Sequence, residues 1–139
     1  VATRRNSYMG YGGSAEYVDA IANIVLCFMI EKKGALDNLD EILENPNVEM
    51  IQWGPADFSM NTGHPGNPTH PEVLEAKKKT FTTAIRKGVP PRAEINSADQ
   101  AKEYLDMGVR HFSVGTDLSI LFNFWKKEGE LILRALKGE

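Results

Sequence analysis

The chain has only one cysteine, no long apolar segment and no excess of basic residues. Each of these features excludes a class of structure or function. Cys27 is the only cysteine among 139 residues, so an internal disulfide is excluded and the thiol is expected to pack as a small apolar group. The apolar run around it, residues 24–30, is far too short to cross a bilayer. A net charge of −3 leaves no basic stripe for a nucleic acid. We therefore expect a cytoplasmic protein that binds neither membrane nor nucleic acid.

Short strand-like runs alternate regularly with helical patterns along the chain. The strand-like runs cover residues 24–30, 48–53, 92–95 and 109–114. The first is apolar throughout, which is typical of a strand buried on both faces of a parallel sheet. Helical patterns follow over residues 36–43, from Pro71 to Gly88, from Ser97 to Gly108 and after Asp117. The third run is the weakest of the four strand patterns.

This alternation predicts an α/β fold with a parallel sheet covered by helices. A (β/α)8 barrel of the TIM type needs roughly 250 residues, so the chain supplies about four βα units of one. The alternative is an open, doubly wound sheet. Its commonest dinucleotide-binding form is disfavoured because no glycine-rich phosphate fingerprint follows the first strand.

Local signals mark where two of the helices begin. The segment Thr69-His70-Pro71-Glu72 reads as a capping box with proline at the first helical position. Ser97-Ala98-Asp99-Gln100 reads as a second capping box. For the last helix, Asp117 is expected to act as the cap rather than as a metal ligand.

Acidic residues follow the predicted strands. Glu31 follows the first, Asp57 the second, Glu94 lies near the end of the third, and Asp117 follows the fourth. Parallel strands deliver their carboxyl ends to one edge of the sheet, where active sites collect. Carboxylates without cysteine or histidine suit Mg²⁺ or Mn²⁺ rather than zinc. The alternatives are a solvated or lysine-paired Glu31, and an Asp57 that merely caps a helix or forms a turn.

The turn Gly54-Pro55-Ala56-Asp57 adds a second feature at the same edge. Small residues let a ligand approach the backbone closely, and proline stiffens the turn. Free N–H groups of Ala56 and Asp57 are then suited to hold a small carboxylate. The alternative is a tight exit from the strand with no ligand.

A family resemblance joins these features. In order along the chain stand Met29-Ile30-Glu31, Gly54-Pro55-Ala56-Asp57-Phe58-Ser59, Gly63-His64-Pro65-Gly66, His70-Pro71-Glu72-Val73 and Val114-Gly115-Thr116-Asp117. This set resembles the HpcH/HpaI family of class II (metal-dependent) 2-keto-3-deoxy acid aldolases, in the phosphoenolpyruvate/pyruvate barrel superfamily. The resemblance implies that residues 1–139 are the C-terminal half of a single (β/α)-barrel aldolase domain, and so its last four βα units.

The resemblance also implies an activity and a site. Family members reversibly cleave a 4-hydroxy-2-keto acid to pyruvate and an aldehyde, through a pyruvate enolate that a bound Mg²⁺ or Mn²⁺ stabilises. Carried onto this chain, the metal ligands are Glu31 and Asp57. The pyruvate carboxylate is received by the amides of Ala56 and Asp57, and Gly54 lines the same pocket. Lys32 and Lys33 are then solvated charges, because no Schiff base is needed.

Two departures from the family pattern qualify the site. The catalytic arginine and histidine of the family come from early strands and have no counterpart here, so the acid–base residues of this chain are unknown. Arg4, Arg5 and residues 8–12 match a segment that should line the mouth of the barrel without replacing those groups. Many relatives carry a glutamine two residues before the metal-binding glutamate, where this chain has Met29, which cannot hold a metal-bound water.

The remaining aromatic and histidine residues are assigned mainly to structure. Trp53 is expected in the core, and His64 and His70 to be solvent-exposed or structural. The final helix resembles one that packs across a subunit boundary, which predicts a homo-oligomer; an intramolecular core is the alternative. Two other functions remain open, namely citryl- or malyl-CoA lyase chemistry on the same barrel and a non-catalytic half-barrel fragment.

Overall fold

The structure is a computed structural model that describes residues 13–138. Its centre is a four-stranded parallel sheet with the strand order β1-β2-β3-β4. The strands are β1 (Cys27–Ile30), β2 (Met50–Trp53), β3 (Pro91–Ile95) and β4 (His111–Val114). Each strand pairs with its neighbour in sequence, so β1 and β4 form the two edges. The chain thus advances across the sheet in one direction, as in a barrel wall.

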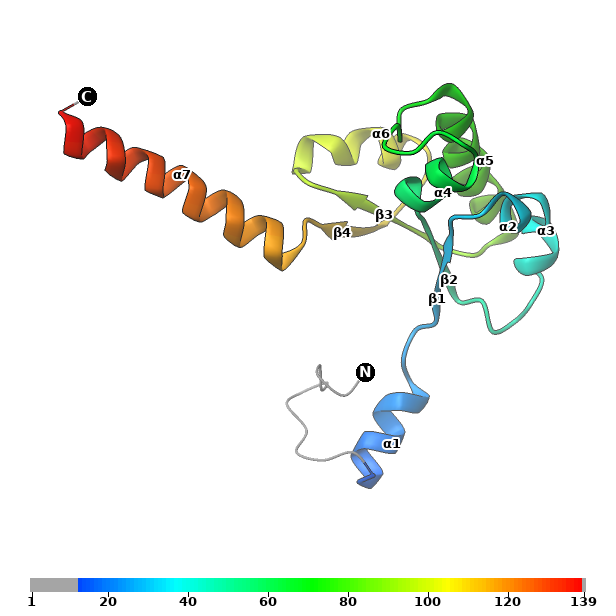
Figure 1. Cartoon of the computed structure of the whole chain (residues 1–139). Helices are drawn as coiled ribbons and strands as arrows, with labels where there is room; N and C mark the ends of the chain where they lie inside the picture. The colour runs from blue at the N-terminus through cyan, green and yellow to red at the C-terminus, as the bar shows by residue number, and fades with distance from the viewer. Residues whose placement is uncertain (1–12, 139) are drawn as a thin grey trace.

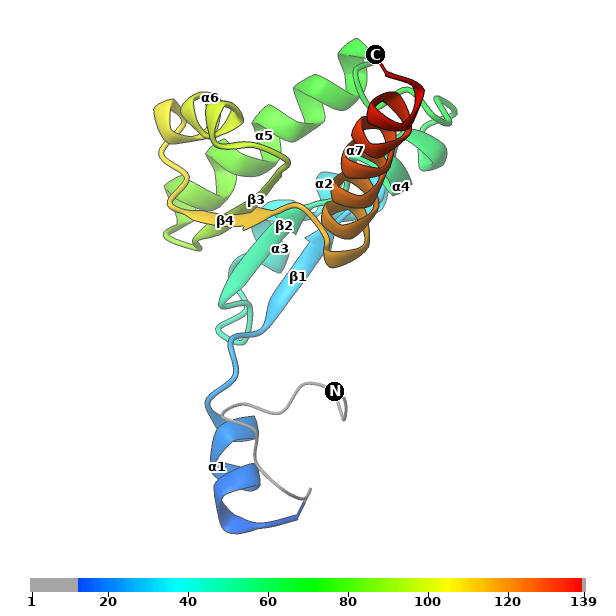
Figure 2. The same ribbon diagram turned by 90° about the vertical axis from the view of Figure 1, so that its left-hand side faces the viewer.

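Helices cover one face of this sheet (Figures 1 and 2). They are α2 (Lys33–Asp37), α3 (Leu39–Ile42), α4 (Pro55–Asn61), α5 (Pro71–Lys87), the 3₁₀ turn η2 (Ala98–Gln100) and α6 (Ala101–Asp106). The core lies between them and the sheet, where Ile30, Ile51 and Ala93 meet Leu39 of α3 and Phe81 of α5. Burial of such side chains is the dominant favourable contribution to folding.

Two helices lie apart from this body, at opposite ends of the chain (Figure 1). They are α1 (Ala15–Ala22) and α7 (Asp117–Lys137), and neither contains a buried residue. Within residues 13–138, no helix combines the length and apolar character that a transmembrane span requires.

The first strand is shorter than its apolar run predicts. Residues 24–26 lie outside β1 and their side chains are exposed. The pairing begins late because β2 begins at Met50, whose N–H donates to the Leu26 carbonyl at 3.1 Å. The Leu26 N–H turns to the Glu49 carboxylate instead, at 2.7 Å. Apolar composition predicted the position of the strand but overstated its length. It also overstated its burial, because Phe28 and Met29 are exposed and only Ile30 is buried.

The helix predicted over residues 36–43 is divided into α2 and α3 at Asn38. This residue leaves helical geometry, with φ −102° and ψ 19°, and its side-chain amide donates to the Gly34 carbonyl at 2.8 Å. Asparagine competes for backbone acceptors in this way, which makes it a frequent helix terminator. The buried stripe of Leu36, Leu39 and Leu43 still faces the core as predicted.

The capping predictions need correction. His70, not Thr69, caps α5: its Nδ1 accepts the Glu72 N–H at 3.3 Å. The Ser97 side chain caps no backbone N–H; instead Gln100 accepts the Asn96 N–H at 2.7 Å.

The start of the last helix also differs from the prediction. Thr116 caps α7 through a capping box with Ser119. Asp117 is the first helical residue, and its carboxylate accepts the Leu118 N–H at 2.8 Å. A residue's capping potential is visible in sequence, but which of several adjacent candidates takes the position depends on backbone direction.

Candidate active site at the strand ends

Glu31 and Asp57 lie at the carboxyl ends of neighbouring strands. Ile30 at the end of β1 pairs with Trp53 at the end of β2, so the two ends are level. The Gly54 N–H continues the ladder by donating to the Ile30 carbonyl at 3.1 Å. Glu31 and Asp57 are both half-buried. The structure therefore places the two predicted ligands on adjacent strand ends, as the sequence indicated.

Gly54 is in close contact with Glu31. A Cβ added at Gly54 would lie 2.7 Å from the Glu31 Cβ and 2.8 Å from its Oε2. Both separations are shorter than atoms tolerate without displacement. Gly54 is needed here for space, not for an unusual backbone angle, since its φ is −109°. The missing side chain leaves the room that the Glu31 carboxylate occupies.

Helix α4 is fixed by its own aromatic anchor. Phe58 is buried, and its ring centroid lies 4.7 Å from that of Trp53 at the end of β2. Its N–H donates to the Gly54 carbonyl at 3.1 Å, which closes the first helical turn. The Ser59 hydroxyl donates to the Ala56 carbonyl at 2.7 Å. These contacts hold Asp57, the residue before Phe58, at the edge of the sheet, and they confirm Trp53 as a core residue.

The first turn of α4 offers two backbone donors. The first intrahelical bond is made by Phe58, so Ala56 and Asp57 precede the residues whose N–H groups find acceptors within the helix. Pro55 has no N–H at all. Ala56 as a whole residue is exposed. The first turn of α4 therefore has two donors without intrahelical acceptors, and the carboxylate-binding turn stays a prediction.

Lysine pairing does not account for Glu31. Lys33 lies 3.9 Å from Asp37 within α2, and its backbone N–H donates to the Asn61 side chain at 2.8 Å. Among residues 13–138, no basic side chain forms an ion pair with Glu31 or Asp57. Two half-buried carboxylates without a cationic partner are a suitable set of oxygen donors for a hard divalent cation. The donor chemistry thus fits Mg²⁺ or Mn²⁺.

The other two acids have different positions. Glu94 accepts a hydrogen bond from the Gln52 side chain at 2.5 Å and borders a cavity of about 210 Å³. That cavity lies at the carboxyl ends of β3 and β4 and reaches Pro55, the start of α4. Asp117 is the first residue of the exposed helix α7, which extends away from the sheet (Figure 1). Three of the four acids are therefore associated with the strand ends, and Asp117 belongs to a helix start.

A polar network on the bare face of the sheet was not predicted. Gln52 is only 2% exposed; its carbonyl oxygen accepts from Arg92 Nε at 2.5 Å, and its amide donates to Glu94. In the strand register Gln52 pairs with Met29. An amide side chain thus lies on the neighbouring strand, level with the position where many relatives carry glutamine. The signal in the sequence was a single polar residue inside an otherwise apolar strand.

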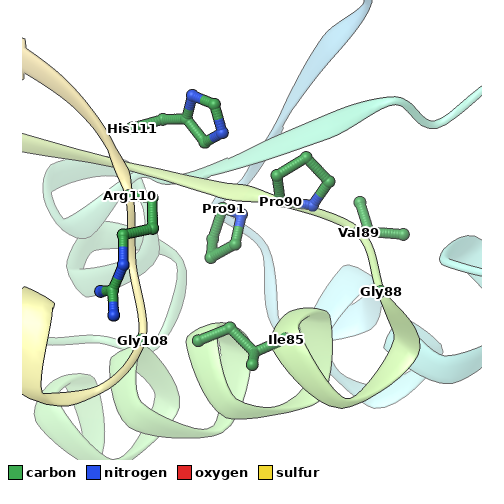
Figure 3. A pocket seen from close by; sticks show the side chains of 8 residues that line it. All are labelled: Ile85, Gly88, Val89, Pro90, Pro91, Gly108, Arg110 and His111. Carbon is green, nitrogen blue, oxygen red and sulfur yellow. The ribbon is translucent and has the colours of Figure 1, made fainter.

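A second hollow lies at the opposite, amino-terminal ends of β3 and β4 (Figure 3). Its volume is about 230 Å³, and its lining includes Arg110 and His111. These two side chains point in opposite directions in Figure 3. Arg110 donates to the carbonyls of Leu105 and Val109 at 3.1 and 2.8 Å, so it secures the approach to β4. No carboxylate lines this hollow, which separates it from the acidic strand ends.

Two further expectations have different outcomes. Arg4, Arg5 and residues 8–12 lie outside the described residues. Cys27 is half-buried, as expected of a small packed group, and burial raises the pKa of its thiol, against a smaller lowering effect of Arg92. The thiol is thus neutral at physiological pH, which suits packing rather than nucleophilic chemistry.

Comparison with known proteins points to one family. Residues 2–123 match the model of the family described as "HpcH/HpaI aldolase/citrate lyase". Over 102 residues, 72% of this chain, it is 37% identical to a 4-hydroxy-2-oxo-heptane-1,7-dioate aldolase of Klebsiella pneumoniae and 36% identical to one of Escherichia coli. The match covers 38% and 39% of those relatives, so the chain spans about two-fifths of their length.

Solved structures agree on the fold. An HpcH/HpaI aldolase from Desulfitobacterium hafniense superposes with a TM-score of 0.73 at 27% identity, covering 85% of this chain and 46% of that one. The citrate synthase SbnG gives a TM-score of 0.74 at 23% identity, covering 96% of this chain and 56% of that one. The predicted α/β fold, in which the chain supplies part of a (β/α)8-type barrel, is thereby confirmed. On the extent of the family match, the chain belongs to the HpcH/HpaI aldolase/citrate lyase family.

Proposed function

We propose that the chain is the metal-binding and pyruvate-binding half of a class II lyase. The reaction is reversible cleavage of a 4-hydroxy-2-keto acid to pyruvate and an aldehyde. The observation that carries the proposal is the arrangement of Glu31 and Asp57 on level strand ends, with Gly54 leaving room for the Glu31 carboxylate. The names of the aldolase relatives support the choice of reaction.

Glu31 and Asp57 are proposed to hold one Mg²⁺ or Mn²⁺. When bound, such an ion draws electron density from the keto oxygen and so favours breaking the C3–C4 bond. Glu31 is directed by its contact with Gly54, and Asp57 by the anchoring of Phe58 against Trp53. These contacts fix the backbone that carries both residues before any ligand arrives, which lowers the cost of binding.

The pyruvate carboxylate is proposed to bind the amides of Ala56 and Asp57. These amides lie in the first turn of α4, where donors lack intrahelical acceptors and the helix dipole favours negative charge. Gly54, one residue before that helix, carries no side chain that would displace the Glu31 carboxylate beside it. The adjoining cavity of about 210 Å³, bordered by Glu94 and Asn96, is positioned to take the remainder of the substrate.

The chain is proposed to be the C-terminal half of one barrel domain. The four βα units leave the sheet face that carries Gln52 and Arg92 without a covering layer of helices. In a closed barrel this face is the interior, where side chains from the remaining strands pack. The acid–base groups that act on the aldehyde side are then supplied from those strands, and α7 packs across a subunit boundary in a homo-oligomer.

Metal binding is the first test. We expect Mn²⁺ to bind the 139-residue chain with one site in an electron paramagnetic resonance titration. Glu31→Gln and Asp57→Asn should each weaken this binding by at least about tenfold, since each removes a charged oxygen ligand. Asp37→Asn is the matched control, because Asp37 is an exposed carboxylate paired with Lys33. Equal Mn²⁺ affinity in the parent and in Glu31→Gln would contradict the assignment.

The chemistry is tested with a substrate that needs only this half of the site. Oxaloacetate loses CO₂ to give pyruvate without a proton being moved on an aldehyde, so it bypasses the absent acid–base groups. We expect Mn²⁺-dependent pyruvate formation above the rate of the free metal, and loss of that excess in Glu31→Gln. A chain that binds Mn²⁺ but forms no excess pyruvate would be the non-catalytic fragment, and the lyase proposal would be wrong.

Citryl- or malyl-CoA cleavage is the competing reaction on the same fold. The family description includes citrate lyase, and a citrate lyase of Burkholderia xenovorans superposes with a TM-score of 0.54 at 20% identity. Product analysis separates the two: formation of acetyl-CoA together with oxaloacetate from citryl-CoA, or with glyoxylate from malyl-CoA, would favour that alternative, whereas pyruvate release from a 4-hydroxy-2-keto acid favours the aldolase.

A further inference from the structure

A histidine and carboxylate cluster lies away from the strand ends, where the chain connects α4 to α5. One imidazole nitrogen of His64, one of His70 and one carboxylate oxygen of Glu72 lie within 4.8 Å of one another. His64 Nε2 is 3.0 Å from Glu72 Oε2. The two rings stack, with centroids 3.5 Å apart and an interplanar angle of 18°. Three potential metal ligands therefore converge on one point of the surface.

The backbone holds these three residues in place. The His64 N–H donates to the Ser59 carbonyl at 2.7 Å, at the end of α4. Asn67 then donates to the His64 carbonyl at 3.0 Å, and His70 donates to the Asn67 carbonyl at 3.2 Å. His70 and Glu72 are fixed in turn by the start of α5. A loop closed by successive backbone hydrogen bonds loses little conformational entropy when a ligand binds to it, which favours binding.

Both histidines are half-buried, and the carboxylate is exposed. The cluster is therefore open to an ion from solvent while its imidazoles are partly shielded from water. Partial shielding strengthens the attraction between the carboxylate and a cation relative to a fully exposed pair. The same cluster without an ion is a hydrogen-bonded His64–Glu72 pair, and the experiment below distinguishes the two.

The donor set differs from that of Glu31 and Asp57. Two imidazole nitrogens and one carboxylate oxygen form the ligand set of many zinc sites, with a fourth position open to water. Imidazole suits Zn²⁺, Co²⁺ and Ni²⁺, whereas Mg²⁺ prefers oxygen ligands only. We propose that His64, His70 and Glu72 form a second metal site, selective for a transition metal of the Zn²⁺ type, which ties the α4–α5 connection together.

Binding requires three small rearrangements. Ligands at about 2.1 Å from one Zn²⁺ lie about 3.4 Å apart in a tetrahedron, so the widest separation, up to 4.8 Å here, contracts by up to about 1.4 Å. The lone pairs of imidazole nitrogens lie in the plane of the ring, so in stacked rings they do not point at a common position. The rings therefore also rotate until both lone pairs point at the same ion. His70 gives up its bond to the Glu72 N–H, since a neutral imidazole has only one free nitrogen pair. That bond is long, at 3.3 Å, so little is lost with it.

The second site is independent of the proposed lyase site. Asp57 lies in the first turn of α4, and His64 follows the other end of that helix. At seven residues, α4 is roughly 10 Å long. One variant can thus remove either site without altering the other's ligands.

The experiment uses untagged 139-residue chain and a titration with Zn²⁺ and Co²⁺, followed by calorimetry and by the visible absorption of bound Co²⁺. We expect one site that survives in Glu31→Gln/Asp57→Asn and that excess Mg²⁺ does not displace. His64→Ala/His70→Ala should weaken it by at least about tenfold. His111→Ala, which removes an exposed histidine of β4, is the matched control. Unchanged binding in the His64/His70 variant, or loss in the Glu31/Asp57 variant, would overturn the proposal.

A second measurement on the unaltered chain removes any dependence on variant folding. Diethylpyrocarbonate modifies accessible imidazoles, and mass spectrometry locates the modified residues. We expect Zn²⁺ to protect His64 and His70 but leave His111 reactive. Equal modification of His64 and His70 with and without Zn²⁺ would show that the cluster is a hydrogen-bonded pair only. A failure of the lyase assay would leave both results unaffected.

Discussion

Helices α5 and α7 are both long and amphipathic, at 17 and 21 residues, but only α5 is packed. Six residues of α5 are buried, among them Val73, Phe81 and Ala84. No residue of α7 is buried. On its apolar side, Phe122 is 63% exposed and Trp125 is 67% exposed. Figures 1 and 2 show α5 against the sheet and α7 extending away from it.

The difference teaches what an amphipathic pattern establishes. The pattern predicts that a helix has an apolar partner, but not where that partner lies. For α5 the partner is the sheet of the same chain. For α7 no described residue serves as one, so the intramolecular core considered from the sequence is not present. A contiguous apolar surface of this kind is typical of an interface, in agreement with the proposed homo-oligomer.

The largest effect that separates the two helices is expected from truncating an aromatic residue in each. Phe81→Ala should lower the free energy of unfolding by about 3–5 kcal/mol, because Phe81 is 1% exposed and packs edge-on against Tyr104 at 5.5 Å. Phe122→Ala in α7 should change it by no more than about 0.5 kcal/mol at low protein concentration. Urea denaturation of both variants measures this. Equal losses would mean that α7 is packed in solution after all.

The second effect concerns association. Trp125→Glu places a charge on the apolar side of α7 and should weaken self-association by at least about tenfold, or about 1.4 kcal/mol. Sedimentation velocity over a range of concentrations measures the change. Asn123→Glu introduces the same charge on the same helix, at a polar position. If both substitutions leave the oligomer intact, α7 is not the interface.

The third effect is local to the start of α7. Thr116 accepts the Ser119 N–H at 3.2 Å, and its own N–H donates to the Ser119 hydroxyl at 3.3 Å. Thr116→Ala should destabilise α7 by about 1 kcal/mol. Since α7 is not packed on the body, amide exchange in α7 should accelerate while the urea midpoint of the body stays constant. A shift of both together would show that the two unfold as one unit.

The smallest effect is expected from the ion pairs that tie α3 to α5. Arg86 lies 2.8 Å from Asp40, and this hydrogen bond, opposed by slight desolvation, holds the pKa of Asp40 below its usual value. A lowered folded-state pKa contributes stability above the unfolded pKa near 3.8, and that stability is lost as pH falls through the folded value. Asp40→Asn should therefore show a slightly shallower loss of stability between pH 5 and pH 2, as urea midpoints would report. A steeper loss would reverse the sign of the argument.

Much of the fold followed from periodicity. All four strands and the helix from Pro71 to Gly88 occur where predicted, and Gly88 ends α5 with a φ of +77°. Helix α1 was missed because its pattern is short and its apolar residues have no partner in the body. Its cap was readable: the Ser14 hydroxyl accepts the Tyr17 N–H at 3.2 Å.

The candidate site was predictable to the extent that it depends on order along the chain. Glu31 and Asp57 were identified by following strands to their ends, and the structure places them on level ends. The Gln52 network and the His64 cluster were not predicted from the sequence, because each depends on contacts between segments that no local pattern encodes. Strand register for the first and a folded loop for the second had to be known before the partners could be named.

The two edges of the sheet have a consequence for assembly. In a parallel sheet the free edge of β1 and the free edge of β4 are unlike. Neither edge can therefore pair in register with its own copy by twofold symmetry while all strands stay parallel. They are instead complementary to each other. Any parallel extension of this sheet is directional: strands joined beyond β4 continue the series until they meet β1. A directional series either closes on itself as a ring or continues as a filament, and only the closed form leaves no strand exposed.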